Sequence, residues 1–173
     1  AFSQIFNFPI WKIEVDELKE IIALECRNPK TTIPYLSVIR FNGELILDQY
    51  PLKQKEWTLA SIQGNYIILK KVADNSPIHP GVWMLDYLHP NEDNQFHQFQ
   101  YLATLENYIQ MRPQHISSGF HQYFSLATQE IVSTIDETIK LFENNIVFPL
   151  AYTSLKPSFL DQFEDNEDLW ISK

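Results

Sequence analysis

The sequence is poor in cysteine and glycine, with 1 and 4 copies among its 173 residues. A single cysteine excludes a disulfide within the chain, so packing has to hold the fold together. So few glycines leave no Walker or Rossmann phosphate-binding pattern, which argues against a nucleotide cofactor. No stretch reaches the roughly 20 apolar residues that a membrane-spanning helix needs. We therefore expect a soluble protein that uses no cofactor.

Basic residues are also scarce, and 22 acidic against 13 basic residues give a formal net charge of −9. Such a field repels nucleic-acid phosphates and anionic lipid head groups, so we expect neither nucleic acid nor a membrane as a partner. Part of the excess lies in an acidic C-terminal segment, residues 158–173, which is typical of a solvated tail. The N-terminus lacks the pattern of a signal peptide, and this favours a cytoplasmic protein. Because the sequence begins with Ala1 rather than methionine, a leader removed upstream stays an open alternative.

Aromatic residues, by contrast, are plentiful at 14% of the chain, with 12 Phe, 8 Tyr and 4 Trp. Aromatic and β-branched side chains suit the pleated surface of a sheet. A chain of 173 residues has the size of one domain and buries enough surface to fold without a disulfide or a structural metal ion. We therefore predict one mainly β domain over residues 1–173.

Local patterns predict a series of hairpins. Period-two alternation predicts a half-buried strand at Ile10–Asp16 and a partner strand at Ile21–Arg27. Between two later strands, Asn42-Gly43 predicts a two-residue type I′ turn, because both residues tolerate positive φ. The other predicted strands are 35–41, 44–50, 57–62, 66–72, 82–87, 99–105, 108–112, 122–126 and 130–134.

The connections between these strands are short, so consecutive strands should be antiparallel neighbours, and no βαβ pattern points to a parallel sheet. From Glu137 the pattern fits a strand pair and a short helix about equally, while Asn144-Asn145 favours strands. Ser158 is placed to cap a short C-terminal helix.

Tryptophan and cysteine give expectations about the core. Trp11, Trp57 and Trp83 lie in or next to predicted strands and are expected to be core anchors. Cys26 shares a strand face with apolar neighbours and is expected to be a buried, inert thiol. Trp170 lies in the acidic tail, where it either packs back onto the domain or contacts a partner.

A loose repeat is also present. A unit opens at Trp57, runs through Gly64 and an apolar strand, and ends in residues 81–86, Gly-Val-Trp-Met-Leu-Asp. It resembles a β-propeller blade of the quinoprotein or WD-like kind, and residues 37–45 and 122–130 look like pieces of further blades.

Phe8-Pro9-Ile10-Trp11 is similar to the N-terminal pattern of an uncharacterised bacterial family with such repeats. Over residues 8–130 the resemblance implies a propeller-like fold and no activity. A closed propeller has at least four blades, each of about 40 residues. A partial propeller, a piece of a larger propeller and a two-layer β-sandwich are therefore the alternatives.

Histidines and carboxylates gather in one proline-rich stretch and suggest a metal site. The candidate ligands are His79, His89, His97, Asp86 and Asp93. Neutral imidazoles and carboxylates can together bind zinc or iron, but this spacing matches no recognised ligand motif. The alternative is a set of solvent-exposed loop histidines.

Two further groups of residues resemble parts of catalytic sites. Paired carboxylates, drawn from Glu14, Asp48, Glu56 and Asp86, are compatible with glycoside hydrolysis, and outward-facing strand residues are the alternative. His115 and His121 flank a serine-containing loop, residues 117–119, without the G-x-S-x-G elbow of an α/β hydrolase, so a polar turn is favoured there.

The sequence thus favours a non-catalytic binding or protein-interaction module with an unknown protein or glycan partner. The alternative is a carbohydrate-active or metal-assisted hydrolase whose groups meet only in the folded chain.

Overall fold

All regular secondary structure in the described part of the chain is β-strand. The computed structural model describes residues 3–72, 81–91, 94–114 and 120–142. Within them, no helix is long and apolar enough to cross a membrane. The predicted C-terminal helix, Trp170 and the turn at Asn144-Asn145 lie outside these residues. The prediction of a mainly β protein is confirmed.

Twelve strands follow one another along these residues. They are β1 (Ile10–Asp16), β2 (Ile21–Arg27), β3 (Pro34–Arg40), β4 (Leu45–Pro51), β5 (Trp57–Gln63), β6 (Tyr66–Lys71), β7 (Val82–Asp86), β8 (Gln95–Phe96), β9 (Phe99–Leu105), β10 (Tyr108–Pro113), β11 (Gln122–Ser125) and β12 (Ile131–Val132).

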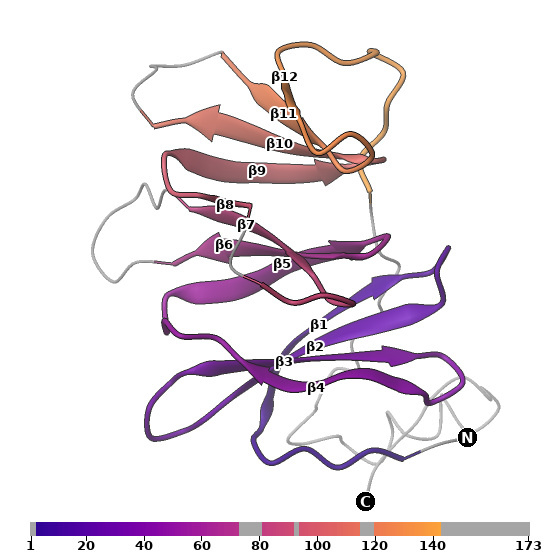
Figure 1. The fold of residues 1–173 in the computed structure, drawn as a ribbon, viewed down its shortest axis with the longest axis vertical. Coiled ribbons are helices and arrows are strands. Elements are labelled where there is room, and N and C mark those ends of the chain that lie inside the picture. Colours follow the sequence, from indigo (N-terminus) through magenta and orange to yellow (C-terminus); the bar gives the residue numbers. More distant parts are fainter. Residues whose placement is uncertain (1–2, 73–80, 92–93, 115–119, 143–173) are drawn as a thin grey trace, which may run out of the picture.

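The strands form three antiparallel sheets of four, each a meander in which consecutive strands are neighbours. We call β1–β4 sheet A, β5–β8 sheet B and β9–β12 sheet C. The sheets are stacked in chain order, with sheet B between the other two (Figure 1). The predicted consecutive hairpins are therefore confirmed. Open, stacked four-stranded sheets fit both a partial propeller and a layered sandwich, and the three described sheets are fewer than the blades of a closed propeller.

The first hydrophobic core fills the space between sheets A and B. It contains Ile21, Ala23, Leu36, Val38, Leu47, Leu52, Trp57, Leu59, Ile62, Ile67, Leu69, Trp83, Leu85 and Tyr87. Trp57 and Trp83 meet edge to face, with ring centroids 5.6 Å apart. Both are nearly fully buried, as predicted. Each large side chain buried here stabilises the stack by about 1.5–3 kcal/mol.

The second core lies between sheets B and C. It contains Ile68, Val82, Met84, Phe99, Ile109, Met111 and Phe124. Successive strand residues point to opposite faces, so in β6 Ile67 and Leu69 pack toward sheet A while Ile68 packs toward sheet C. Because both faces of sheet B are covered, β6 and β7 contain continuous apolar runs, residues 67–69 and 82–85.

Sheets A and B are also joined by a buried carboxylate. Glu25 is 0% exposed. Its Oε1 accepts a hydrogen bond from Arg27 Nε at 2.6 Å, and its Oε2 accepts from Thr58 Oγ1 at 2.8 Å and from Leu59 N at 2.7 Å. A buried charge is tolerated when it is paired and hydrogen-bonded in this way.

The expectation that Trp11 anchors the core is wrong, since this side chain is 68% exposed. The β1–β2 register shifts between Ile10 and Lys12, and this bulge turns Trp11 outward. There the indole ring lies 5.6 Å from the guanidinium carbon of Arg27 in a cation–π contact.

Cys26 is completely buried, as predicted. Burial and, to a smaller extent, the Glu25 carboxylate raise the pKa of the thiol above its ordinary value of 9.0. Because the thiolate is the reactive form, this thiol is inert near neutral pH.

The hairpin at Asn42-Gly43 forms, but the predicted type I′ turn is wrong. Gly43 N donates to Arg40 O at 2.9 Å, and Arg40 N donates to Glu44 O at 2.9 Å, which leaves a three-residue loop that starts at Phe41. Only Gly43, at φ 93°, has positive φ in this loop. This is the pattern of a type I turn followed by a glycine bulge.

The next hairpin forms between the strands predicted at 57–62 and 66–72, but its turn is one residue shorter than the three-residue gap between them. Gln63 pairs with Tyr66, so Gly64 and Asn65 form the turn. Gly64 has φ 60° and Asn65 does not have positive φ, as in a type II′ turn.

Candidate binding cavity between the turns of three sheets

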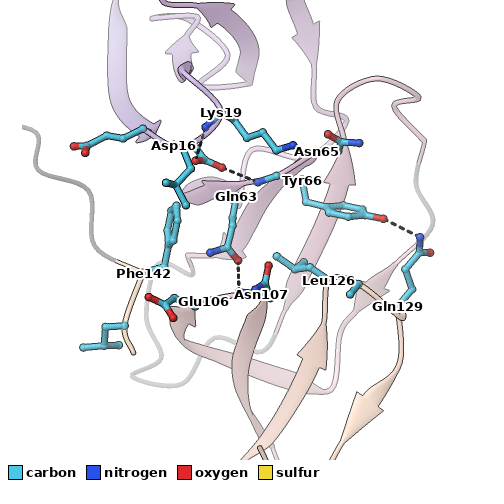
Figure 2. A pocket seen from close by; sticks show the side chains of 15 residues that line it. Asp16, Lys19, Gln63, Asn65, Tyr66, Glu106, Asn107, Leu126, Gln129 and Phe142 are labelled. Atoms are coloured by element: carbon cyan, nitrogen blue, oxygen red, sulfur yellow. Dashed lines mark hydrogen bonds between the residues drawn. The ribbon is translucent and has the colours of Figure 1, made fainter. Parts of the chain in front are cut away.

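A cavity of about 800 Å³ lies where turns of all three sheets meet. In a meander, alternate turns lie at the same end, so the β1–β2, β5–β6 and β9–β10 turns converge once the sheets are stacked. Figure 2 shows the cavity from close by. Its lining comprises Asp16, Glu17, Leu18, Lys19, Gln63, Gly64, Asn65, Tyr66, Glu106, Asn107, Leu126, Ala127, Gln129, Leu141 and Phe142.

Asp16 holds the turns of sheets A and B together. Its side chain is 2% exposed although it ends a strand that leads into a polar turn. One carboxylate oxygen accepts from Lys19 N at 3.1 Å, and the other accepts from Gly64 N at 2.8 Å. Both bonds are drawn in Figure 2. With both oxygens used, Asp16 shapes the wall of the cavity.

Gln63 links sheet B to sheet C and keeps one polar atom free. Its side chain is 6% exposed, and Oε1 accepts from Asn107 N at 3.0 Å. Within the described part of the chain, Nε2 of Gln63 has no hydrogen-bond partner. Because this amide lines the cavity, its two N–H donors are available to a ligand (Figure 2).

Tyr66 forms a second link between sheets B and C. Its hydroxyl accepts a hydrogen bond from Gln129 Nε2 at 2.8 Å (Figure 2). Burial and the nearby Asp86 carboxylate raise the pKa of Tyr66 above 10.0, so the phenol stays neutral at physiological pH. The opening is thus framed by side chains whose positions are fixed by hydrogen bonds across the stack.

The rim carries exposed charges and exposed leucines side by side. Leu18 is 89% exposed and Leu141 is 56% exposed, and both line the cavity. Glu17 and Glu106 are exposed carboxylates on turns of sheets A and C. Lys19 is the only lysine or arginine among the described lining residues. The cavity is therefore acidic with an apolar rim.

Residues 140–142 close the cavity on the side of β9. Leu141 forms an antiparallel bridge with Leu105, and Phe142 N donates to Thr104 O at 3.0 Å. The sequence pattern around these residues fitted a strand pair and a helix about equally. The extended alternative is the one observed, and it places Leu141 and Phe142 in the lining.

The predicted metal ligands are only partly described. Asp86 Oδ2 lies 3.6 Å from Nδ1 of His89, whose side chain is 84% exposed. His97 is instead exposed beside the Trp57 ring, with centroids 6.0 Å apart. The described residues contain no group of three or more potential ligands. His79 and Asp93 lie outside the described residues, so the metal site stays a prediction.

The four carboxylates considered for glycoside hydrolysis come from separate elements. Glu14 on β1 pairs with Lys12 at 2.9 Å, Asp48 is exposed on β4, Glu56 precedes β5 and Asp86 ends β7. None of them lines the cavity.

The serine-containing loop, for which the sequence favours a polar turn over a catalytic pattern, cannot be compared with the structure. His115 and residues 117–119 lie outside the described residues. His121 shares a hydrogen bond of 2.8 Å with the Gln110 side chain on β10, on sheet C.

Comparison of the chain with protein-family models, with curated proteins and with solved structures gave no match. The cavity is therefore the feature of the molecule that indicates a function. Its described lining holds no serine, cysteine or histidine, and it offers amides, carboxylates and apolar side chains instead. Such groups bind by hydrogen bonds, charge and apolar contact.

Proposed function

We propose that this protein is a non-catalytic protein-interaction module that binds its partner at the cavity between the turns. The observation that carries the proposal is Gln63, a buried amide with free Nε2 donors that faces an 800 Å³ cavity. Among the described residues, Trp83 Nε1 is the only buried side-chain polar atom without a partner, so Gln63 Nε2 reaches the solvent in the cavity, where a ligand acceptor can take the place of water.

The size and lining of the cavity support this function. Ligand sites typically enclose about 300–1,000 Å³ and combine apolar walls with a few placed polar groups. Here the polar groups are held by bonds between sheets, such as Asp16 to Gly64 and Tyr66 to Gln129. A site that is ordered before binding loses less entropy when it takes its partner. The lining does contain carboxylates, but Asp16 uses both of its oxygens internally and Glu17 and Glu106 are exposed at the rim, so the lining favours binding over the hydrolase alternative.

A ligand selection with a blocked cavity tests the proposal. A phage-displayed library of random peptides and a glycan array would be screened against the wild-type protein, an Ala127→Trp variant and a Lys30→Trp variant. Ala127 is an exposed residue of the lining, so the indole obstructs the cavity. Lys30 is exposed on the β2–β3 connection, at the other end of sheet A, and serves as the matched control.

We expect ligands that bind the wild-type and Lys30→Trp proteins and lose at least tenfold in affinity for Ala127→Trp. Near-ultraviolet circular dichroism of each variant establishes that the fold is intact. Ligands that bind all three proteins equally would contradict the assignment of the cavity. A failure to select any ligand from either collection would contradict the function itself.

A further inference from the structure

The charges on the rim indicate what kind of partner the cavity accepts. Glu17 and Glu106 have no ion-pair partner within the described residues, whereas both oxygens of Asp16 are used internally. Among the described residues of the lining, Lys19 carries the single ammonium that opposes these carboxylates. The net charge of −9 on the chain adds a field that attracts cations. The charged part of a partner is therefore expected to be positive.

The exposed leucines indicate an apolar neighbour for that positive group. Leu18 and Leu141 expose 89% and 56% of their surface at the rim, and partly buried Leu126 and Phe142 extend the apolar lining inward. An apolar side chain of the partner gains by removing this surface from water. Because the leucines and the carboxylates share one rim, the partner needs a positive group and an apolar side chain close to each other.

Amide groups complete the lining and favour a polypeptide over a sugar. Gln63 Nε2 offers two donors from the cavity wall, and Asn65 and Asn107 add exposed amides at the rim. Backbone carbonyls and N–H groups of an extended peptide match such amides. A neutral sugar can donate its hydroxyls to the rim carboxylates, but it brings neither a positive charge to balance them nor a large apolar side chain to cover the leucines.

Resting on the proposed function, we infer that the cavity takes a polypeptide segment in which a lysine or arginine stands next to a large apolar residue. The cation lies between Glu17 and Glu106. The apolar side chain packs on Leu18 and Leu141, and a backbone carbonyl accepts from Gln63 Nε2.

The test uses three capped nine-residue peptides that share the same glycine and leucine residues. They carry lysine, serine or glutamate at the same positions between the leucines. Each is titrated into isotopically labelled protein, and the amide signals of residues 16–19, 63–66 and 106–107 report binding in the cavity. We expect the lysine peptide to bind at least tenfold more tightly than the serine peptide, and the glutamate peptide to bind least.

Charge reversal at the rim provides the decisive comparison. The double variant Glu17→Lys/Glu106→Lys should lose at least tenfold in affinity for the lysine peptide and gain affinity for the glutamate peptide. Glu137→Lys reverses an exposed carboxylate outside the lining and should leave the order of affinities unchanged. If Glu137→Lys lost as much affinity for the lysine peptide as the double variant does, the peptide would be attracted to the whole acidic surface. That result would overturn the inference.

The remaining outcomes separate this inference from the proposed function. If all three peptides shift the cavity signals with equal affinity, the cavity binds peptides without selecting charge, and the inference fails alone. If only glycan ligands shift these signals, the binding function stands and a peptide partner is excluded. If no ligand from the peptide or glycan collections shifts them, both are wrong.

Discussion

Glu25 has no exposed surface, yet it is a charged residue in a strand whose other members, apart from Arg27, are apolar. Strand alternation places it on a face, but nothing in the sequence shows that Arg27 and Thr58 will meet it there. The same is true of Asp16, which the pattern places at the end of a strand, and of Gln63, which falls between two predicted strands, because the burial of both depends on the neighbouring sheet. Polar residues that join the sheets are therefore the part of the molecule that sequence patterns predict least well.

Removing the Glu25 carboxylate should destabilise the fold strongly. Glu25→Ala leaves the Arg27 guanidinium and Leu59 N without their acceptor, and breaking a buried ion pair in this way costs about 3–5 kcal/mol. Glu44→Ala breaks the exposed pair with Arg40 and should cost no more than about 1 kcal/mol. Urea unfolding followed by circular dichroism measures both. Similar costs for the two variants would show that Glu25 does not hold the sheets together.

At the scale of strands and turns, the sequence predicts much of the fold. The predicted bounds of β1, β2 and β9 agree with the structure. In β2 both faces are buried, so a short apolar run rather than alternation marks that strand. Local bulges are where the prediction fails. One bulge at Ile10/Lys12 turns Trp11 to solvent, and alternation alone cannot show where an extra residue is inserted.

The turn at Asn42-Gly43 gives a test at this scale. Gly43→Ala places a Cβ at φ 93° and should cost about 1–2 kcal/mol, since an L-residue is strained at positive φ. Asn42→Ala loses only the exposed bond from Glu44 N to Asn42 Oδ1 and should cost about 0.5 kcal/mol. Thermal unfolding of both variants gives the comparison. Equal costs would favour the type I′ turn, in which both residues need positive φ.

At the scale of the whole molecule, the stack of sheets decides where a partner can bind. Each hairpin is a local feature, and the sequence predicts most of them. That the β1–β2, β5–β6 and β9–β10 turns enclose one cavity follows only from how the sheets pack through their two cores. The described histidines and carboxylates that the sequence suggests as site residues do not line this cavity, because residue chemistry alone does not show how the sheets pack. The resemblance to propeller blades stays a prediction.

A fluorophore attached at the rim of the cavity reports whether a ligand binds there. Asn65→Cys places a thiol on the exposed turn of the lining, and Lys30→Cys places one at the other end of sheet A. Cys26 is 0% exposed, so bimane labels only the introduced thiol of the native protein. With ligands selected against the wild-type protein, we predict a saturable change in bimane emission at Asn65→Cys and none at Lys30→Cys. A change at Lys30→Cys with none at Asn65→Cys would contradict the account.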